Sequence, residues 1–368
     1  MYTFELSDRY LSNEEISVFQ GYLDFYGLDN SVWEVFSCLF NSSVGHIQPL
    51  LLRTFKDDHL YGVAVIIKCR KYGRSFFSNK LVAGLVDTVN LPFYLWIKFG
   101  CCMDMMSNPG FVKDPEKTDE IIRAMVAYLK KRNLMTVICD LRENAGQFES
   151  ASIFPALPQA LIDCTTYTTV ADYTTHYKNI KRKIRKFGNK QGVYTRVDHQ
   201  LSEEHLIDLK RCFEVTIDKS VIYLPYQDLY LNAALTTGRT KIDNIYYFIA
   251  TIDGEFIGYQ TALVTGKYLN ALHGAFDRTL KTTYHAYDIM FVKMAEFALE
   301  NGLEFVDFGG VANFTKEKMA NTLRETSYFI FSKYPLVQKA IDSMFKFTMI
   351  QGEDQLKFSE STAVKAKG

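Results

Sequence analysis

The chain has 368 residues, of which 48% are hydrophobic and 23% are charged, and its formal net charge is +0. At this length two domains of ordinary size can each bury a core. The neutral charge balance argues against a DNA-binding protein. No apolar run approaches the roughly 20 residues of a membrane helix, so a membrane-spanning protein is not expected either.

Seven cysteines are present, and no two of them stand in a Cys-x-x-Cys pair. An odd number without this spacing predicts neither a disulfide framework nor a zinc site, and it is typical of a reducing compartment. Residues 1–5 lack the basic and apolar regions of a secretory signal. We therefore expect a cytoplasmic protein, with a polar, flexible tail over residues 351–368.

The first half of the chain predicts two helices, a hairpin, a strand, a helix and a strand. The last of these helices has a clear start, since Asp114 can serve as its N-cap and Pro115 occupies the first helical position. Two β-rich runs around a short polar turn are typical of a hairpin. In chain order, the predicted elements are helices starting near residue 12 and covering 31–40, strands 48–54, 61–68 and 93–103, a helix over 114–133 and a strand over 135–140.

The second half repeats this order of elements, which indicates a structural repeat of one domain. Its predicted elements are helices from residue 202 and over about 226–235, a hairpin of 245–252 and 256–265, a strand over 268–277, a helix over 284–300 and a strand over 304–308. The strand that ends at Asp140 corresponds to the strand that carries Asp307. We predict an N-terminal domain at 1–165 that is structural or shapes the acceptor site, and a C-terminal domain at 166–350 with the donor site.

The chain is organised around residues 268–310. Apolar residues at helical spacing place the predicted helix on a sheet. A helix N-terminus offers free N–H groups and partial positive charge, which suit a phosphate or a developing oxyanion. The residues directly before this helix that can bind such a group are Arg278, Lys281, Thr282 and Thr283.

The order of elements resembles the GNAT N-acyltransferase fold. The tandem arrangement resembles the FemAB-like branch, the aminoacyltransferases of peptidoglycan bridges and their acyltransferase relatives. The local matches are the basic run 177–186, followed by Gly192-Val193, the segment Asp253-Gly254-Glu255-Phe256-Ile257-Gly258, and Val306-Asp307-Phe308-Gly309-Gly310. The resemblance implies an α+β fold in α/β layers, with two tandem domains that each contain a mixed, mostly antiparallel sheet flanked by helices. It also implies acyl-CoA or a phosphopantetheine thioester as co-substrate and no tightly bound cofactor.

One stretch departs from the pattern of ordinary GNAT enzymes, which hold the acyl-CoA pyrophosphate on a Q/R-x-x-G-x-G/A turn. The corresponding residues 278–283 contain no glycine. FemAB-like proteins commonly depart in the same way, so this difference favours that branch.

Four residues of the strand–helix–strand unit are candidates for catalysis, because acyl transfer to an amine needs a group that accepts the amine proton. His273 and Asp277 share one face of the predicted strand, and either can be the base. Tyr287 can donate a proton to the leaving group, and Asp307 can act as a base or bind the acceptor amine if the two strands splay. Each residue also has a plain structural alternative, such as a hydrogen-bonded core histidine or a loop-capping aspartate.

The run 178–190 contains seven basic residues and no acidic residue, and it predicts an amphipathic helix that ends at Gly188. Its basic side is either a solvated face or a docking face for a polyanion, namely the phosphates of CoA, an acyl carrier protein or tRNA. The candidate donor-binding residues are Lys178, Arg182, Arg185 and Lys186, with Lys316 and Lys318 as further phosphate contacts.

We predict an N-acyltransferase that forms an amide between an acyl thioester, from CoA or an acyl carrier protein, and the amine of an amino acid, a peptide or another small molecule. One alternative keeps the fold and uses an aminoacyl-tRNA as donor. Another is a non-catalytic GNAT-like binding protein.

Overall fold

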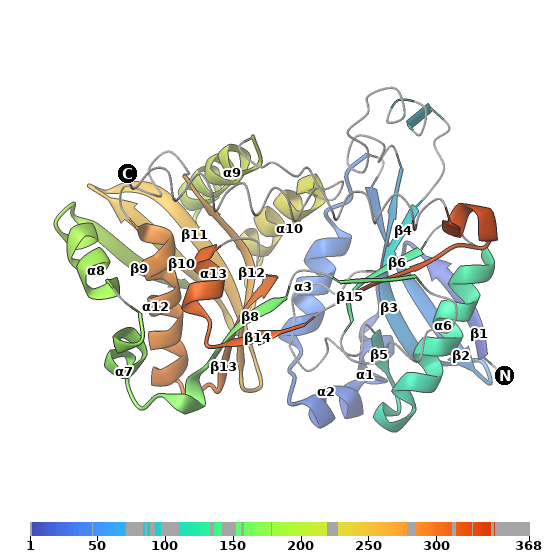
Figure 1. The fold of residues 1–368 in the computed structure, drawn as a ribbon. Coiled ribbons are helices and arrows are strands. Elements are labelled where there is room, and N and C mark those ends of the chain that lie inside the picture. The colour runs from blue at the N-terminus through green and yellow to red at the C-terminus, as the bar shows by residue number, and fades with distance from the viewer. Residues whose placement is uncertain are drawn as a thin grey trace.

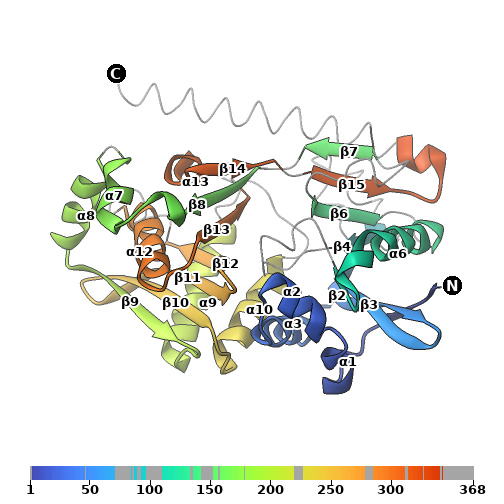
Figure 2. The ribbon, with the colours of Figure 1, turned by 90° about the horizontal axis from the view of Figure 1, so that it is seen from below.

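The structure is a computed structural model that describes residues 2–45, 47–70, 84, 87–88, 93–96, 110–132, 136–141, 152–155, 158–177, 179–218, 227–277, 285–310, 314–325, 327–339 and 342. Two sheets lie side by side, with helices α3 (Ser31–Phe40) and α10 (Gln227–Arg239) between them (Figures 1 and 2). The predicted tail over 351–368 lies outside the described residues.

The first half supplies most of the first sheet. Its described strands are β1 (Tyr2–Ser7), β2 (Ile47–Lys56), β3 (His59–Cys69), β4 (Phe93–Trp96), β5 (Gly110–Val112), β6 (Thr136–Leu141) and β7 (Ser152–Pro155). Its described helices, besides α3, are α1 (Asn13–Ser17), α2 (Gln20–Tyr26) and α6 (Thr118–Arg132), which follows the 3₁₀ turn Pro115–Lys117. The predicted helices and hairpin are confirmed, but the chain begins with a strand rather than a helix. Only the first part of the predicted strand 93–103 is described, as β4.

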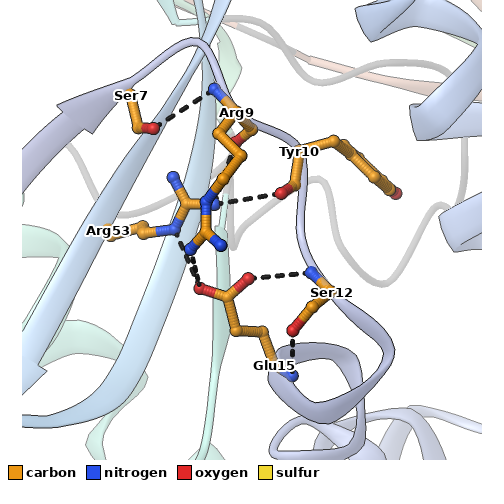
Figure 3. Close-up of polar contacts among 6 residues, drawn as sticks. All are labelled: Ser7, Arg9, Tyr10, Ser12, Glu15 and Arg53. Carbon is orange, nitrogen blue, oxygen red and sulfur yellow. Dashed lines mark hydrogen bonds and ion pairs between the residues drawn. The ribbon is translucent and has the colours of Figure 1, made fainter.

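A buried arginine fixes the start of the first sheet (Figure 3). The side chain of Arg53 on β2 is 1% exposed, and its Nε lies 3.3 Å from Oε1 of Glu15 on α1. Its Nη2 donates to the backbone oxygens of Arg9, at 2.8 Å, and Tyr10, at 3.2 Å. Ser12 and Glu15 form a capping box at the start of α1. The segment between β1 and α1 is therefore tied to the sheet by one charged side chain.

The second half supplies most of the second sheet. Its described strands are β9 (Gly192–Asp198), β10 (Ile245–Ile252), β11 (Glu255–Thr265), β12 (Tyr268–Phe276), β13 (Phe305–Gly310) and β14 (Thr322–Arg324). Its described helices, besides α10, are α7 (Val170–Thr175), α8 (Ile180–Gly188), α9 (Glu203–Asp218), α12 (Ala286–Glu300) and α13 (Phe314–Met319). Asp253 and Gly254 both have positive φ, as a tight hairpin turn between β10 and β11 requires. The hairpin and the strand–helix–strand unit are as predicted.

Each sheet contains one strand from the other half of the chain. In the second sheet, β8 (Gln159–Asp163) lies between β14 and β13. In the first sheet, β15 (Ser327–Phe331) lies between β6 and β7. The predicted boundary at residue 165 would assign β8 to the first domain and β15 to the second, whereas the pairing of these strands is the reverse. The two halves thus exchange one strand each.

The two halves also share a hydrophobic core. One buried cluster continues from the first sheet through α3 and α10 to the near face of the second sheet. A second cluster, on the opposite face of the second sheet, is covered by α7, α8 and α12. Where the halves meet, a Cβ on Gly266 would lie 2.4 Å from the backbone oxygen of Gly27, so this contact requires glycine. Two layers of packing therefore hold the second sheet in place.

Candidate active site

Strands β12 and β13 are paired at one end and separate at the other. Their parallel pairs are Tyr268 with Phe305, Leu269 with Val306 and Asn270 with Asp307. No further pair between these strands is recorded among the described residues, although β12 continues to Phe276 and β13 to Gly310. We call the diverging residues, 271–276 of β12 and 308–310 of β13, the β12–β13 fork. Its apex is the last strand pair, Asn270 with Asp307. This divergence is the geometry on which the predicted catalytic site depends.

The paired end of β12 and β13, before the fork, is stabilised by side-chain contacts directly before the first strand pair and within it. Lys267 Nζ lies 2.5 Å from Oε1 of Glu304, directly before the two strands begin. The rings of Tyr268 and Phe305 stack with their centroids 4.9 Å apart. The last pair, Asn270 and Asp307, is buried, with exposed fractions of 1% and 7%. The fork therefore has a fixed apex with two polar side chains.

Four aromatic rings join the two arms of the fork on the side of α12. Phe276 ends β12 and contacts Tyr287 of α12, with 5.3 Å between ring centroids. Tyr287 contacts Phe291 one turn later, also at 5.3 Å, and Phe291 lies 4.0 Å from Phe308 of β13. Helix α12 thus covers one face of the fork with an aromatic layer. The predicted acid, Tyr287, belongs to this layer and is half-buried.

The carboxylate of Asp307 is held in one orientation. Its Oδ1 accepts a hydrogen bond from the backbone N–H of Gly309 at 2.8 Å, and its Oδ2 accepts one from the side-chain amide of Gln159. Gly309 has φ +66°, so it supplies this N–H from a conformation that favours glycine. Gln159 comes from β8, the exchanged strand, and is 1% exposed. A carboxylate has about four acceptor positions, so Asp307 keeps capacity for a further donor.

His273 and Asp277 lie toward the other face of the sheet. His273 is 6% exposed, and its ring lies 6.1 Å from that of Tyr230 on α10. Burial lowers the pKa of His273 to about 4, so its imidazole is neutral at pH 7. Asp277 follows the end of β12, where its backbone N–H donates to Ile257 at 2.8 Å. His273 and Asp307 therefore belong to the strands β12 and β13, and Asp277 directly follows β12.

A β-bulge lies inside the fork. The register between β11 and β12 pairs Thr261 with His273 and Ala262 with Ala271, so Leu272 is the extra residue of β12. A bulge interrupts the regular ladder and changes the direction of neighbouring backbone groups. Beyond Asn270 the edge of β12 that faces β13 has no strand pairing among the described residues, so its backbone N–H groups are candidate donors for an oxyanion.

The predicted basic helix is confirmed as α8, and it packs against the first turn of α12. Lys183 Nζ lies 3.0 Å from Oδ1 of Asp288, whose Oδ2 lies 3.6 Å from Nδ1 of His285. Burial and the nearby Lys183 lower the pKa of His285. Lys183 is the only member of α8 in an ion pair with a described residue. Lys186 also acts on His285, so two cations of α8 lie near the N-terminus of α12. The other cations of α8, Lys181, Arg182 and Arg185, are exposed.

The other predicted donor-binding residues are placed as follows. Lys178, Arg278, Lys281, Thr282 and Thr283 lie outside the described residues. Lys316 and Lys318 lie on α13, and the Lys316 ammonium donates to the backbone oxygen of Phe308 in β13. Lys316 thus binds one arm of the fork, whereas Lys318 is exposed.

Sequence reasoning missed Gln159 and Asn270. Gln159 lies 148 residues before Asp307, in a strand whose sheet could not be assigned from local pattern. Asn270 stands among apolar neighbours in the predicted strand. A polar amide in a buried strand is unusual, and this could have marked Asn270 as a candidate site residue.

Residues 175–317 match the sequence model of a family described as acetyltransferase (GNAT) domain. This range includes α8, the fork, α12 and most of α13. The second half therefore contains a segment that matches GNAT acetyltransferases, and this match supports a transferase enzyme of the acyl-transfer class. No curated protein sequence matches the chain.

Several solved structures share the fold over nearly the whole chain. The C-terminal domain of a putative lysylphosphatidylglycerol synthetase from Agrobacterium fabrum has a TM-score of 0.54 at 10% identity, over 90% of this chain and 95% of that one. L-PGS from Bacillus licheniformis has a TM-score of 0.54 at 10% identity, over 92% and 98%. FemX has a TM-score of 0.51 at 12% identity, over 91% and 99%. The predicted α+β fold is thus confirmed, and FemX is among the structures that share it.

None of the described helices combines the length and the apolar character that a bilayer span requires.

Proposed function

We propose that this protein is an N-acyltransferase that forms an amide between an acyl thioester and the amine of an amino acid, a peptide or another small molecule. The observation that carries the proposal is the β12–β13 fork inside the segment that matches the GNAT domain. One arm offers backbone N–H groups of a bulged strand, and the apex offers a fixed carboxylate. Acyl transfer to an amine requires both an oxyanion donor and a proton acceptor.

The reaction joins R–CO–S–R′ and R″–NH₃⁺ to give R–CO–NH–R″, R′–SH and H⁺. The ammonium first loses a proton, and the neutral nitrogen then attacks the carbonyl carbon. A C–N bond forms and the C–S bond breaks. The sulfur leaves as a thiolate that is protonated on release. No oxidant, reductant or metal is required by this balance.

Asp307 is the proposed group that binds the amine and receives or relays its proton, because two hydrogen bonds hold its carboxylate in one orientation at the fork apex. Asp277 is a second candidate base at the far end of β12. His273 is a third candidate, although burial lowers its pKa to about 4 and so opposes protonation. Tyr287, half-buried on α12, is the proposed proton donor to the leaving group.

The donor is proposed to be acyl-CoA or an acyl carrier protein, bound through its phosphate at the N-terminal end of α12. Helix α8 packs beside this end, where Lys183 pairs with Asp288 and Lys186 acts on His285, and it carries further exposed cations. Arg278, Lys281, Thr282 and Thr283 directly precede this helix in the sequence. Anions are favoured at such a position by free N–H groups and by neighbouring cations. A reducing, cytoplasmic location agrees with four buried free cysteines among the described residues.

Aminoacyl-tRNA is the alternative donor. Residues 278–283 lack the glycines of an ordinary CoA-binding turn, and the same basic face fits a nucleic-acid backbone. One fold neighbour is named as a putative lysylphosphatidylglycerol synthetase, so an amino acid is part of its named product. A non-catalytic GNAT-like binding protein is the third possibility.

Thiol release from a panel of acyl-CoA thioesters, measured with and without primary amines, tests the main proposal. We expect amine-dependent release that is retained after RNase treatment. Activity that needs aminoacyl-tRNA and disappears with RNase would instead identify the alternative donor. If neither thioesters nor aminoacyl-tRNA are turned over, the non-catalytic possibility is correct.

A further inference from the structure

The side-chain amide of Asn270 has a fixed orientation. Its Nδ2 lies 3.3 Å from the backbone oxygen of Leu263 and 2.7 Å from Oγ1 of Thr265, both on β11. A backbone oxygen only accepts hydrogen bonds, so the group that faces Leu263 is the NH₂ group. Because the amide is planar, Oδ1 is directed away from β11. Strand β13 is the neighbour on that side, and Asp307 is the residue paired with Asn270.

Oδ1 of Asn270 is buried and has no hydrogen-bond partner in the described part of the chain. Buried polar atoms without a partner are rare in native proteins and cost free energy. Here the atom belongs to the strand partner of Asp307, whose carboxylate already accepts two N–H groups and has capacity for more. Among the described residues, the fork apex therefore presents two acceptors, the neutral Oδ1 and the carboxylate, and no donor to Oδ1.

We propose that Asn270 Oδ1 and Asp307 together form a binding site for a primary ammonium group, the amine end of the acceptor substrate. This proposal rests on the proposed function, which requires an amine at the fork. A primary ammonium has three N–H donors and one positive charge. Two donors satisfy Oδ1 and the carboxylate, and Asp307 neutralises the charge in a buried setting. Asn270 is thus a specificity-determining residue, because a nitrogen without N–H groups leaves Oδ1 unsatisfied.

Gln159 is a positioning residue for this site. Its amide donates to Oδ2 of Asp307, while Gly309 donates to Oδ1, so the carboxylate cannot rotate without losing one of these bonds. Gln159 is supplied by the exchanged strand β8. The first half of the chain therefore contributes to the amine site directly, through one buried side chain.

The binding test uses n-butylammonium as probe and butyltrimethylammonium as a cation that has no N–H donor. Ligand-observed NMR titrations at constant ionic strength are made with the wild-type protein, Asn270→Leu and Thr265→Val. Asn270→Leu removes Oδ1 at similar volume. Thr265→Val removes one partner of Nδ2 and leaves Oδ1 in place, so it is the matched control for lost packing and lost bonds toward β11.

We expect n-butylammonium to bind the wild type, the dissociation constant to rise at least tenfold in Asn270→Leu, and the change in Thr265→Val to stay within twofold. Equal binding of the two cations, or an unchanged constant in Asn270→Leu, would overturn the proposal. An equal loss in both variants would also overturn it, since the effect would then be structural. Binding is measured without any thioester, so the titration does not depend on turnover. If the wild type shows no acyl transfer, the proposed function is refuted, but the binding result still stands.

Where turnover is found, Asn270→Leu is expected to raise the KM for n-butylamine at least tenfold and to leave the KM for the thioester within twofold. Gln159→Leu is expected to lower kcat with a smaller rise in the amine KM, because it frees the carboxylate without removing an acceptor. A parallel rise of both KM values in Asn270→Leu would contradict a role in binding the amine.

Discussion

The two halves of the chain build the same strand pair and end it differently. In the first half, β4 and β6 pair as Tyr94 with Thr136, Leu95 with Val137, and Trp96 with Ile138. In the second half, β12 and β13 pair as Tyr268 with Phe305, Leu269 with Val306, and Asn270 with Asp307. Both pairs are parallel and begin with Tyr-Leu. The last pair is apolar in the first half and polar in the second. The two halves therefore share the same strand pairing, but only the second half has polar residues at the last pair.

The helices that follow these strands show a related difference. Helix α6 follows a turn that Asp114 caps, and it has acidic residues in its first turn and basic residues in its last, as the helix dipole favours. Helix α12 is preceded by His285 in a left-handed conformation, without a side-chain cap. Its one acidic residue in the first turn, Asp288, is paired with Lys183. The N-terminus of α6 is capped by its own sequence, whereas the N-terminus of α12 is contacted by a lysine of α8.

The sharpest way to break the comparison is to remove the charge at the apex. We expect Asp307→Asn to lower turnover about a hundredfold or more, as loss of a general base does. An amide at 307 would also bring an NH₂ group against Gly309 N–H or the Gln159 amide. Asp140→Asn, on the corresponding strand of the first half, is the control and should leave kcat within twofold. Steady-state kinetics measure kcat of both variants, and melting curves show whether each variant is folded. Equal losses of kcat in the two variants would show that the two halves do not differ in this role.

Arg53 tests whether the first half is a scaffold. We expect Arg53→Met to lower the free energy of unfolding by about 2 kcal/mol, less than the cost of breaking a fully buried pair, because Glu15 is 18% exposed. Arg9→Met is a matched control, since Arg9 binds the same oxygen of Glu15 at 2.9 Å but is 68% exposed. That surface pair should contribute less than about 1 kcal/mol. Urea titrations give both values, and similar losses in the two variants would show that burial of Arg53 is unimportant.

The buried histidine of the second half should make stability depend on pH. Burial lowers the pKa of His273 to about 4, below the usual value near 6.5 of the unfolded chain, so the unfolded state binds the proton more readily. Stability from this group is therefore complete above about pH 6.5 and is lost toward pH 4, by up to about 1.4 kcal/mol per pH unit.

Unfolding free energies between pH 7 and 4.5 should fall less steeply in His273→Gln than in the wild type. His59→Gln is the control in the first half, because His59 is exposed at the start of β3. The same pH dependence in wild type and His273→Gln would mean that His273 does not titrate as its burial requires.

The smallest expected effect concerns the basic face of α8. The triple variant Arg182→Ala, Arg185→Ala and Lys186→Ala should raise the KM for an acyl-CoA about tenfold and weaken its salt dependence. The KM for an acyl-pantetheine without phosphates should not change, which makes that thioester an internal control. An unchanged KM for both donors would show that α8 is a solvated face, as an exposed basic helix can be.

Local pattern predicted the elements of the second half well, because their signals are contained in short stretches. The predicted strand 268–277 and helix 284–300 correspond to β12 and α12, and Asp253-Gly254 correctly marked the hairpin turn. Strand β1 was missed although Tyr2, Phe4 and Leu6 alternate with polar residues and pack on the core. A short alternating run at the start of a chain was outweighed by the strong helix signal after Ser12.

The strand exchange was not predictable in the same way. β8 and β15 pair with strands far away along the chain, and no local property of either strand states its partner. The same limit applied to the candidate site. Asp307 and His273 were found because polar residues in a strand are conspicuous, whereas Gln159 acquires meaning only once β8 lies beside β13.

The exchange of β8 and β15 has a consequence for anyone who wishes to produce one half as a smaller enzyme. A fragment that starts after residue 165 loses the strand that borders β13, together with the Gln159 amide on Asp307. Its partner fragment lacks the strand between β6 and β7. Each piece would expose an open sheet edge that matches a strand carried by the other. We therefore expect each half, when produced alone, to aggregate through its open sheet edge, and the two halves to fold only when they are combined.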